Sequence, residues 1–176
     1  MPILAVVSDD QGGQVVYDTN ELGRLNDAYL YDGTAIVASA IMHYTAQGWL
    51  DTVTLNDADG LSSIVSTYDH DAAGKLTSIK HESIGSSTIT LSEFDYTYDD
   101  AGRITQYTGP EGTRDYTYDK TDQMLTVTAP SGPTTLESFS YDANGNRDMS
   151  GYSTVTGNRL HSDGTSITPT TTRATL

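Results

Sequence analysis

Residues 96–104 read YTYDDAGRI, and this stretch decides the fold. Alternate side chains of an extended strand share a face, so Tyr96 and Tyr98 lie together and the threonine between them points the other way. Asp99 then opens a four-residue turn, because its carboxylate can accept backbone N–H groups, and Gly102 stands where such a turn needs a positive φ. The stretch therefore predicts the tip of a β-hairpin with a glycine bulge.

The same pattern recurs along the chain. Imperfect copies read YDTNELGRL at residues 17–25, YDHDAAGKL at 68–76, YTYDKTDQM at 116–124 and FSYDANGNR at 139–147. Aligned on the turn glycine, they repeat at intervals of roughly 20 to 28 residues, which is the range of stacked supersecondary units. Asp122 stands in for the glycine in the copy that lacks one.

The repeat predicts an all-β chain of tandem β-hairpin (YD) repeats that form a curved or spiralling antiparallel sheet strip. A lone hairpin is marginal in water, so each copy is expected to lay its tyrosines on those of its neighbours. Charge-assisted hydrogen bonds are predicted across the turn from Asp99 to Arg103 and from Asp71 to Lys75. The motif residues expected to carry architecture, and not chemistry, are Tyr17, Gly23, Arg24, Gly48, Tyr68, Asp71, Gly74, Tyr96, Tyr98, Asp99, Gly102, Arg103, Tyr116, Tyr118, Asp119, Tyr141, Asp142 and Gly145.

One copy departs from the pattern. Residues 43–50 read HYTAQGWL, which keeps the glycine but has Thr45 in place of the turn aspartate and Trp49 in place of the arginine. The preceding residues, 35–42, are the most continuous apolar run of the chain. They predict a strand covered on both faces and the densest part of the core. No segment has a sustained helical period, so very little helix is expected.

The composition limits the architecture and the partners. The chain has 176 residues, a formal charge of −15 and no cysteine. Nucleic acid and anionic membranes are disfavoured, because both are bound mainly through Lys and Arg. We expect one hairpin array over residues 1–165 and a disordered Thr-rich tail over 166–176. The apolar residues 3–7 are too short for a secretory leader, and no stretch has the length of a membrane span.

No motif predicts catalysis, a cofactor or a metal ion. Residues 69–74 read DHDAAG and mimic the start of a calcium loop, but Ala73 and Lys80 occupy ligand positions that need oxygen donors. The four histidines lack metal-ligand spacing, and nucleophile elbows and phosphate loops are missing. The protein is therefore expected not to be an enzyme. Carbohydrate binding stays open as an alternative, because tyrosine rings beside Asp, Asn and Arg can stack on sugars.

The phrases YDDAGRI at residues 98–104, YDANGNR at 141–147 and GNRL at 157–160 resemble the RHS/YD-repeat family of bacterial cell-surface and toxin-associated proteins. The likeness covers roughly residues 14–165. It implies a long β-sheet ribbon that spirals into a hollow shell. In full-length relatives the shell encloses a C-terminal toxin or effector, and in the animal teneurins it supports adhesion.

The resemblance also implies a role. Because family shells use many more repeats, the chain is expected to be a fragment that serves as a non-enzymatic structural, encapsulating or interaction segment. Its expected partners are proteins, namely the remaining repeats, an encapsulated effector or a second copy paired through the sheet edges. The alternative is a carbohydrate-binding or adhesin module. The family implies a bacterial cell-surface or secreted location, although the chain shows no signal peptide.

Overall fold

The computed structural model describes residues 5–10, 12–129, 135–157 and 159–163. Within these ranges the regular elements are all strands and there is no helix, which confirms the predicted all-β fold of tandem hairpins. The predicted tail, residues 166–176, lies outside the described residues. The strands are β1 Ala5–Ser8, β2 Gly13–Thr19, β3 Leu25–Asp32, β4 Ala35–Tyr44, β5 Leu50–Asp57, β6 Ser63–His70, β7 Leu76–Ile84, β8 Thr88–Tyr98, β9 Ile104–Gly109, β10 Gly112–Tyr118, β11 Met124–Thr128, β12 Thr135–Ser138, β13 Tyr152–Val155 and β14 Arg159–Asp163.

The strands follow one another in chain order. β1 to β12 form a 12-stranded sheet in which each strand neighbours the next, and β13 pairs with β14 in a second sheet. By contacts the chain divides into two compact units. The first unit is Met1–Tyr98 with Tyr107–Gly112, and the second is Asp99–Gln106 with Thr113–Leu176.

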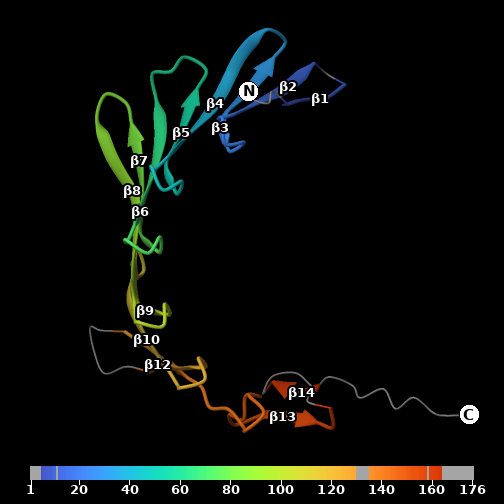
Figure 1. Cartoon of the computed structure of the whole chain (residues 1–176), viewed down its shortest axis with the longest axis vertical. Coiled ribbons are helices and arrows are strands. Elements are labelled where there is room, and N and C mark those ends of the chain that lie inside the picture. Colours follow the sequence, from blue (N-terminus) through green and yellow to red (C-terminus); the bar gives the residue numbers. More distant parts are fainter. Residues whose placement is uncertain (1–4, 11, 130–134, 158, 164–176) are drawn as a thin grey trace, which may run out of the picture. The chain divides into compact units, whose positions relative to one another are not determined.

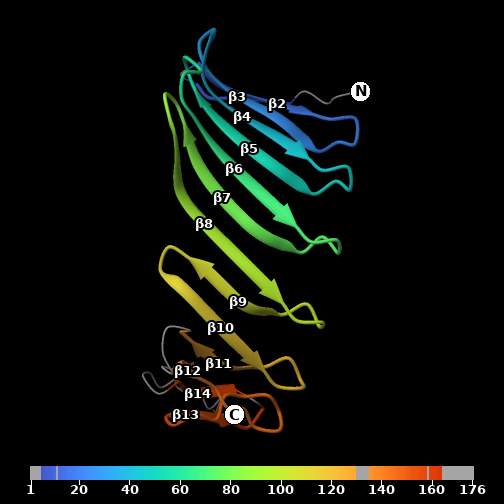
Figure 2. The ribbon, with the colours of Figure 1, turned by 90° about the vertical axis from the view of Figure 1, so that its left-hand side faces the viewer.

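In the first unit, β2 to β8 lie side by side and hairpins connect them, as Figure 2 shows. The motif turns join β2 to β3, β4 to β5 and β6 to β7 at one end of the strands. Next to each of these turns the pairing register shifts, for example between Asp69 and His70. A positive-φ glycine beside a register shift is the geometry of the predicted glycine bulge.

The register makes one face of the first unit more apolar than the other. Met42 lies opposite Val53, Val53 opposite Ser66, and Ser66 opposite His81, so these side chains share a face. Met42 and Ser66 are buried, and the Ser66 hydroxyl is hydrogen-bonded to His81 Nδ1 at 2.7 Å. The interior of this unit is therefore a single layer of side chains on one side of a sheet.

The prediction that residues 35–42 are covered on both faces is wrong. They lie in β4, where Ile36 is 43% exposed and Met42 is the buried residue. Among the described residues only Met42 and Val127 are buried hydrophobic side chains. The run is apolar, but no second layer of described chain packs on the sheet, so one face of β4 stays open.

The second unit repeats the hairpin plan. β11 lies between β10 and β12, where Val127 is opposite both Tyr116 and Glu137 and is 8% exposed. Figure 1 shows β13 and β14 as a hairpin of their own, in red. Their pairing is antiparallel and runs from Tyr152 opposite Asp163 to Val155 opposite Arg159.

Candidate functional site

The repeated turn is organised by one carboxylate. Asp99 Oδ1 accepts hydrogen bonds from the backbone N–H groups of Ala101 and Arg103, at 3.0 and 2.9 Å. The Asp99 N–H donates to the Arg103 carbonyl, and the Gly102 N–H donates to the Asp99 carbonyl. The predicted positive φ of Gly102 is confirmed at 83°. The aspartate thus satisfies N–H groups that a tight turn would otherwise leave to solvent.

Other copies of the motif form the same turn. Asp71, Asp119 and Asp142 each accept from the N–H groups two and four residues further on, at 2.7 to 2.9 Å. Asn20 does so with its amide oxygen, at 3.0 and 3.1 Å. In the divergent copy, Thr45 Oγ1 still accepts from the Trp49 N–H at 3.2 Å. The substituted residues at this position all keep an oxygen acceptor.

The fourth turn position has a positive φ in the motif copies. Gly23, Gly48, Gly74 and Gly145 have φ values of 75°, 94°, 83° and 82°. The predicted substitute, Asp122, has a φ of 66° and is the one non-glycine residue with a positive φ among the described residues. Aspartate is among the few residues that tolerate this region, which explains why it can replace glycine here.

Ion pairs cross the turn as predicted. Arg103 Nη2 lies 2.7 Å from Asp99 Oδ2, and Lys75 Nζ lies 3.5 Å from Asp71 Oδ2. The pKa of Asp99 is lowered, first by the hydrogen bond from the backbone N–H of Arg103 and then by its guanidinium. The pKa of Asp71 is lowered, with the backbone N–H of Lys75 as the largest cause. Both carboxylates therefore stabilise the turn in their charged form.

This lowering predicts a pH-dependent contribution from Asp99. Because its pKa is lower in the folded chain than in the unfolded one, its contribution is fully present above the unfolded pKa, near 4, and is lost as the pH falls through the folded pKa. We expect Asp99→Asn to lower the urea midpoint at neutral pH and to have little effect in strong acid. The measurement is a pair of urea titrations of the wild type and the variant at the two pH values.

Asp100→Asn is the matched control, since it removes one charge from the same turn but leaves the hydrogen bonds of Asp99 in place. It distinguishes the loss of the Asp99 carboxylate from the general effect of removing one negative charge from the chain. An Asp99→Asn effect of equal size at both pH values would contradict the role of the charged form.

The side chain that follows the positive-φ position reaches into the next copy of the repeat. We call these side chains the bridge residues: Arg24, Trp49, Lys75, Arg103 and Gln123. The Arg103 guanidinium lies over the ring of Tyr118, with Cζ 4.7 Å from the ring centroid. The corresponding distances are 4.6 Å for Arg24 and Tyr44, and 5.2 Å for Lys75 Nζ and Tyr98. These are cation–π distances, and each joins one repeat to the next.

The prediction that the motif tyrosines lie mainly on tyrosines of neighbouring copies is therefore wrong for the position just before the turn. There the ring is covered by a cation, because the register puts the bridge residue of one copy beside the aromatic residue of the next. A tyrosine pair does occur further from the turn, where the rings of Tyr96 and Tyr107 are 5.7 Å apart. The ring of Tyr107 also stacks on Phe94 at 6.2 Å.

The hydroxyl of the same tyrosine makes a second link to the preceding copy. Tyr118 Oη donates to the Ile104 carbonyl at 2.8 Å, and Ile104 directly follows the bridge residue Arg103. The bond recurs from Tyr44 to the Leu25 carbonyl at 2.6 Å. It recurs again from Tyr98 to Leu76 at 2.6 Å and from Tyr141 to Met124 at 3.0 Å. The ring and the hydroxyl of Tyr44, Tyr98 and Tyr118 are thus both in contact with the preceding copy.

Several bridge residues end on the turn of the next copy. Arg24 Nη1 donates to the Gly48 carbonyl at 2.7 Å, and Gln123 Nε2 donates to the Gly145 carbonyl at 3.4 Å. Arg103 Nη1 donates to the Asp119 carbonyl at 3.0 Å. These contacts tie the turn of one hairpin to the turn of the following one.

Trp49 makes the equivalent contact through its ring. Its centroid is 5.4 Å from that of His70, which occupies the position just before the turn. The ring also covers Gly74 so closely that a Cβ at this glycine would lie 2.6 Å from a ring carbon. The divergent copy therefore replaces the cation with an aromatic side chain and keeps the bridge.

Comparison with known proteins agrees with this plan. A family model described as RHS Repeat matches residues 70–114 and 98–135. Residues 70–135 are therefore similar to RHS repeats. No curated protein matches the chain. The matched residues contain the turns that begin at Asp71, Asp99 and Asp119, and RHS repeats are structural, so the chain is a structural repeat protein in which repeat assembles on repeat.

The other predicted motif tyrosines lie inside strands. Tyr17, Tyr68 and Tyr116 are half-buried and lie opposite Ala28, Ile79 and Val127, away from the turns. The bridge is not apparent from a single copy of the motif, because its two side chains belong to different copies. The signal for it is an aromatic residue directly before the turn, and these residues are Tyr44, His70, Tyr98, Tyr118 and Tyr141.

Two further kinds of feature are absent from the described residues. In those residues no group of three or more His, Asp and Glu side chains is placed to hold a metal ion. They also contain no helix that is long and apolar enough to cross a bilayer. The bridge geometry instead fixes hairpins relative to their neighbours, which is an architectural task.

Proposed function

We propose that the chain is a non-enzymatic wall segment of an RHS-type assembly, in which stacked hairpins enclose or display another polypeptide. The observation that carries this proposal is the repeated bridge. Two positions of the repeat, the one after a turn and the one before the next turn, link successive copies. Their side chains make a ring contact, and the tyrosine hydroxyl donates a hydrogen bond to a backbone carbonyl.

The tyrosine rings, tyrosine hydroxyls and turn carboxylates of the motif already have partners within the chain, which supports a structural role over carbohydrate binding. A sugar needs open ring faces and free hydrogen-bonding groups. Tyr44, Tyr98 and Tyr118 each have a cation over the ring and a hydroxyl that donates to a carbonyl. The turn carboxylates are likewise occupied by backbone N–H groups. Nothing favours the carbohydrate alternative strongly enough to propose it.

The test is purification of the chain from its native host under non-denaturing conditions. We expect chemical cross-linking to join it to further RHS repeats, and we expect a second polypeptide in the same particle to resist protease until the particle is denatured. A wall segment requires both results, since repeats must continue the sheet and something must lie behind it.

A glycan array is the complementary measurement. A chain that purifies alone and binds a glycan saturably, with loss of binding in Tyr44→Phe or Tyr98→Phe variants that keep their circular dichroism spectrum, would overturn the proposal. Leu22→Gln, a change at a 76% exposed side chain in the turn of the first described copy, is the control for unspecific surface effects.

A further inference from the structure

The apolar face of the first unit carries a trough that the repeat contacts do not use. Val15, Ala28, Leu30, Ala38, Ala40 and Leu55 line one open hollow of about 280 Å³ across β2 to β5. The register explains it, because Leu30 lies opposite Ala38, and Ala40 lies opposite Leu55. Three alanines form a low floor between the larger side chains, so the surface is concave there.

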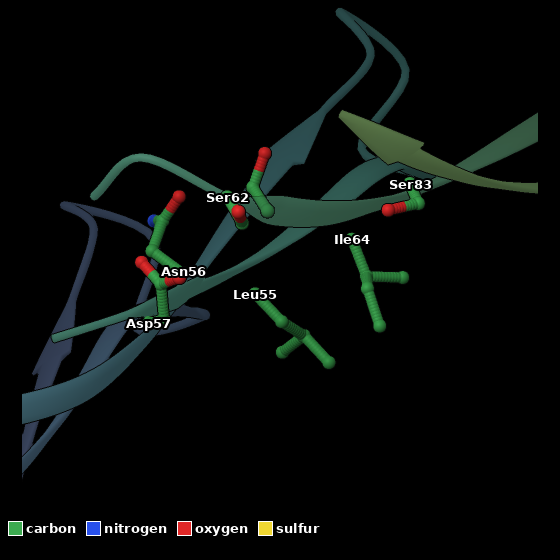
Figure 3. A pocket seen from close by; sticks show the side chains of 7 residues that line it. Leu55, Asn56, Asp57, Ser62, Ile64 and Ser83 are labelled. Carbon is green, nitrogen blue, oxygen red and sulfur yellow. The ribbon is translucent and has the colours of Figure 1, made fainter. Parts of the chain in front are cut away.

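The trough continues toward β6. Leu55 also lines the adjoining hollow, with Ile64, which is its register partner. Figure 3 shows Leu55 and Ile64 projecting to the same side of their strands. Leu30, Leu55 and Ile64 are 43%, 46% and 41% exposed. A contiguous group of half-exposed aliphatic side chains on a monomer surface indicates an interaction site.

The charges around the trough are of one sign. Residues 25–74, which supply β3 to β6, contain seven aspartates and neither lysine nor arginine. Asp57 lies opposite Ala38 in the register and lines the second hollow beside Leu55. Asp32 lies two residues beyond Leu30 on the same strand, and therefore on the same face. The apolar floor thus has carboxylates at one end and no cation from its own strands.

We propose that this trough docks a cationic, amphipathic segment of another polypeptide, with aliphatic side chains on the floor and lysine or arginine beside Asp32 and Asp57. The inference rests on the proposed wall function for its biological setting and names the chemistry of the partner. It needs an apolar stripe to cover Leu30 and Leu55, and basic residues to complement the carboxylates of Asp32 and Asp57.

The same charges argue against other occupants. A second copy would bring another chain with a formal charge of −15 against a surface that has no cation to pair with it. Like charges in apposition disfavour such a contact. An anionic bilayer is disfavoured for the same reason. A basic amphipathic polypeptide is the occupant for which apolar burial and electrostatic attraction would both favour binding to the trough.

The experiment uses the purified full chain and fluorescent synthetic peptides. The probe peptide alternates leucine with lysine, and its matched control replaces each lysine with glutamate. We expect saturable binding of the lysine peptide by fluorescence anisotropy and at least about tenfold weaker binding of the glutamate peptide, which corresponds to about 1.4 kcal/mol.

Variants locate the site. Leu30→Gln and Leu55→Gln should each weaken binding of the lysine peptide several-fold, whereas Leu136→Gln, at a 48% exposed side chain on β12, should not. Asp57→Asn is an independent test that leaves the floor unchanged, and it should weaken binding and reduce its salt dependence. Circular dichroism spectra verify that each variant is folded.

Three results would overturn the proposal. One is equal binding of the lysine peptide by Leu55→Gln and Leu136→Gln. Another is self-association of the wild type that Leu55→Gln abolishes, which would assign the trough to a second copy. The third is binding to anionic vesicles that Leu55→Gln abolishes. None of these bears on the cross-linking and protease results that test the wall function, so the two proposals fail separately.

Discussion

Gly74→Ala is expected to lower the free energy of unfolding by about 2–3 kcal/mol, the largest effect among the changes considered. About 1–2 kcal/mol arises because a non-glycine residue must adopt the positive φ of 83°. About 1 kcal/mol more arises because the new Cβ would lie 2.6 and 2.7 Å from Trp49 ring carbons, so the ring must move. The ring is itself held against His70, which limits how far it can shift.

Gly23→Ala is the matched control for this change. Gly23 has a φ of 75° in the same type of turn in the same unit, but a Cβ there would meet nothing within 4 Å. It should therefore lose only the conformational part, about 1–2 kcal/mol. The measurement is a urea titration followed by far-ultraviolet circular dichroism for each variant.

A double-mutant cycle assigns the difference to the ring. Combined with Trp49→Ala, the Gly74→Ala change should cost no more than Gly23→Ala does. Equal losses for Gly74→Ala and Gly23→Ala in the presence of Trp49 would contradict the bridge between these two copies.

Replacing Tyr118 is expected to have the second largest effect. Tyr118→Phe removes the hydrogen bond to the Ile104 carbonyl and should cost about 1 kcal/mol. Tyr118→Leu also removes the ring beneath the Arg103 guanidinium and should cost about 2 kcal/mol, since a cation–π contact at a partly exposed site contributes about 0.5–1 kcal/mol. The leucine variant thus loses both links that Tyr118 makes to the preceding copy.

Tyr116→Phe is the matched control. Tyr116 lies two residues earlier on β10, half-buried and opposite Val127, and it is outside the bridge. Urea titrations of the three variants should rank them with Tyr118→Leu least stable and Tyr116→Phe closest to the wild type. If Tyr118→Phe and Tyr118→Leu lose the same stability, the cation over the ring contributes nothing.

The local structure of each repeat was predictable because it depends on short-range rules. Period-two alternation, an aspartate that accepts nearby N–H groups and a glycine at the positive-φ position are all readable from residues 96–104. Even Asp122 was identified as a glycine substitute, and its φ of 66° agrees. The ion pair of Asp99 and Arg103 was predictable as well, since the two residues flank one turn.

The contacts between repeats were harder to predict, because they depend on which side chains the register brings together across neighbouring strands. Tyrosines of neighbouring copies were expected to lie on one another, but the ring just before the turn has a cation over it, as for Lys75 and Tyr98. The coverage expected over residues 35–42 was inferred from apolar character alone. Apolar character does not reveal whether a second layer exists, and the exposed Ile36 reflects its absence from the described chain.

The sequence by itself determined that this protein is a series of hairpins with fixed turns, since those features follow from the spacing of a few residue types. Only the tertiary structure decided that Arg24, Trp49, Lys75 and Arg103 reach the aromatic residue before the next turn. It also decided that valine, alanine and leucine side chains from four strands meet in one trough. Both depend on strand register, which brings together residues from different copies of the repeat, such as Arg24 and Gly48, and is not encoded in any single copy.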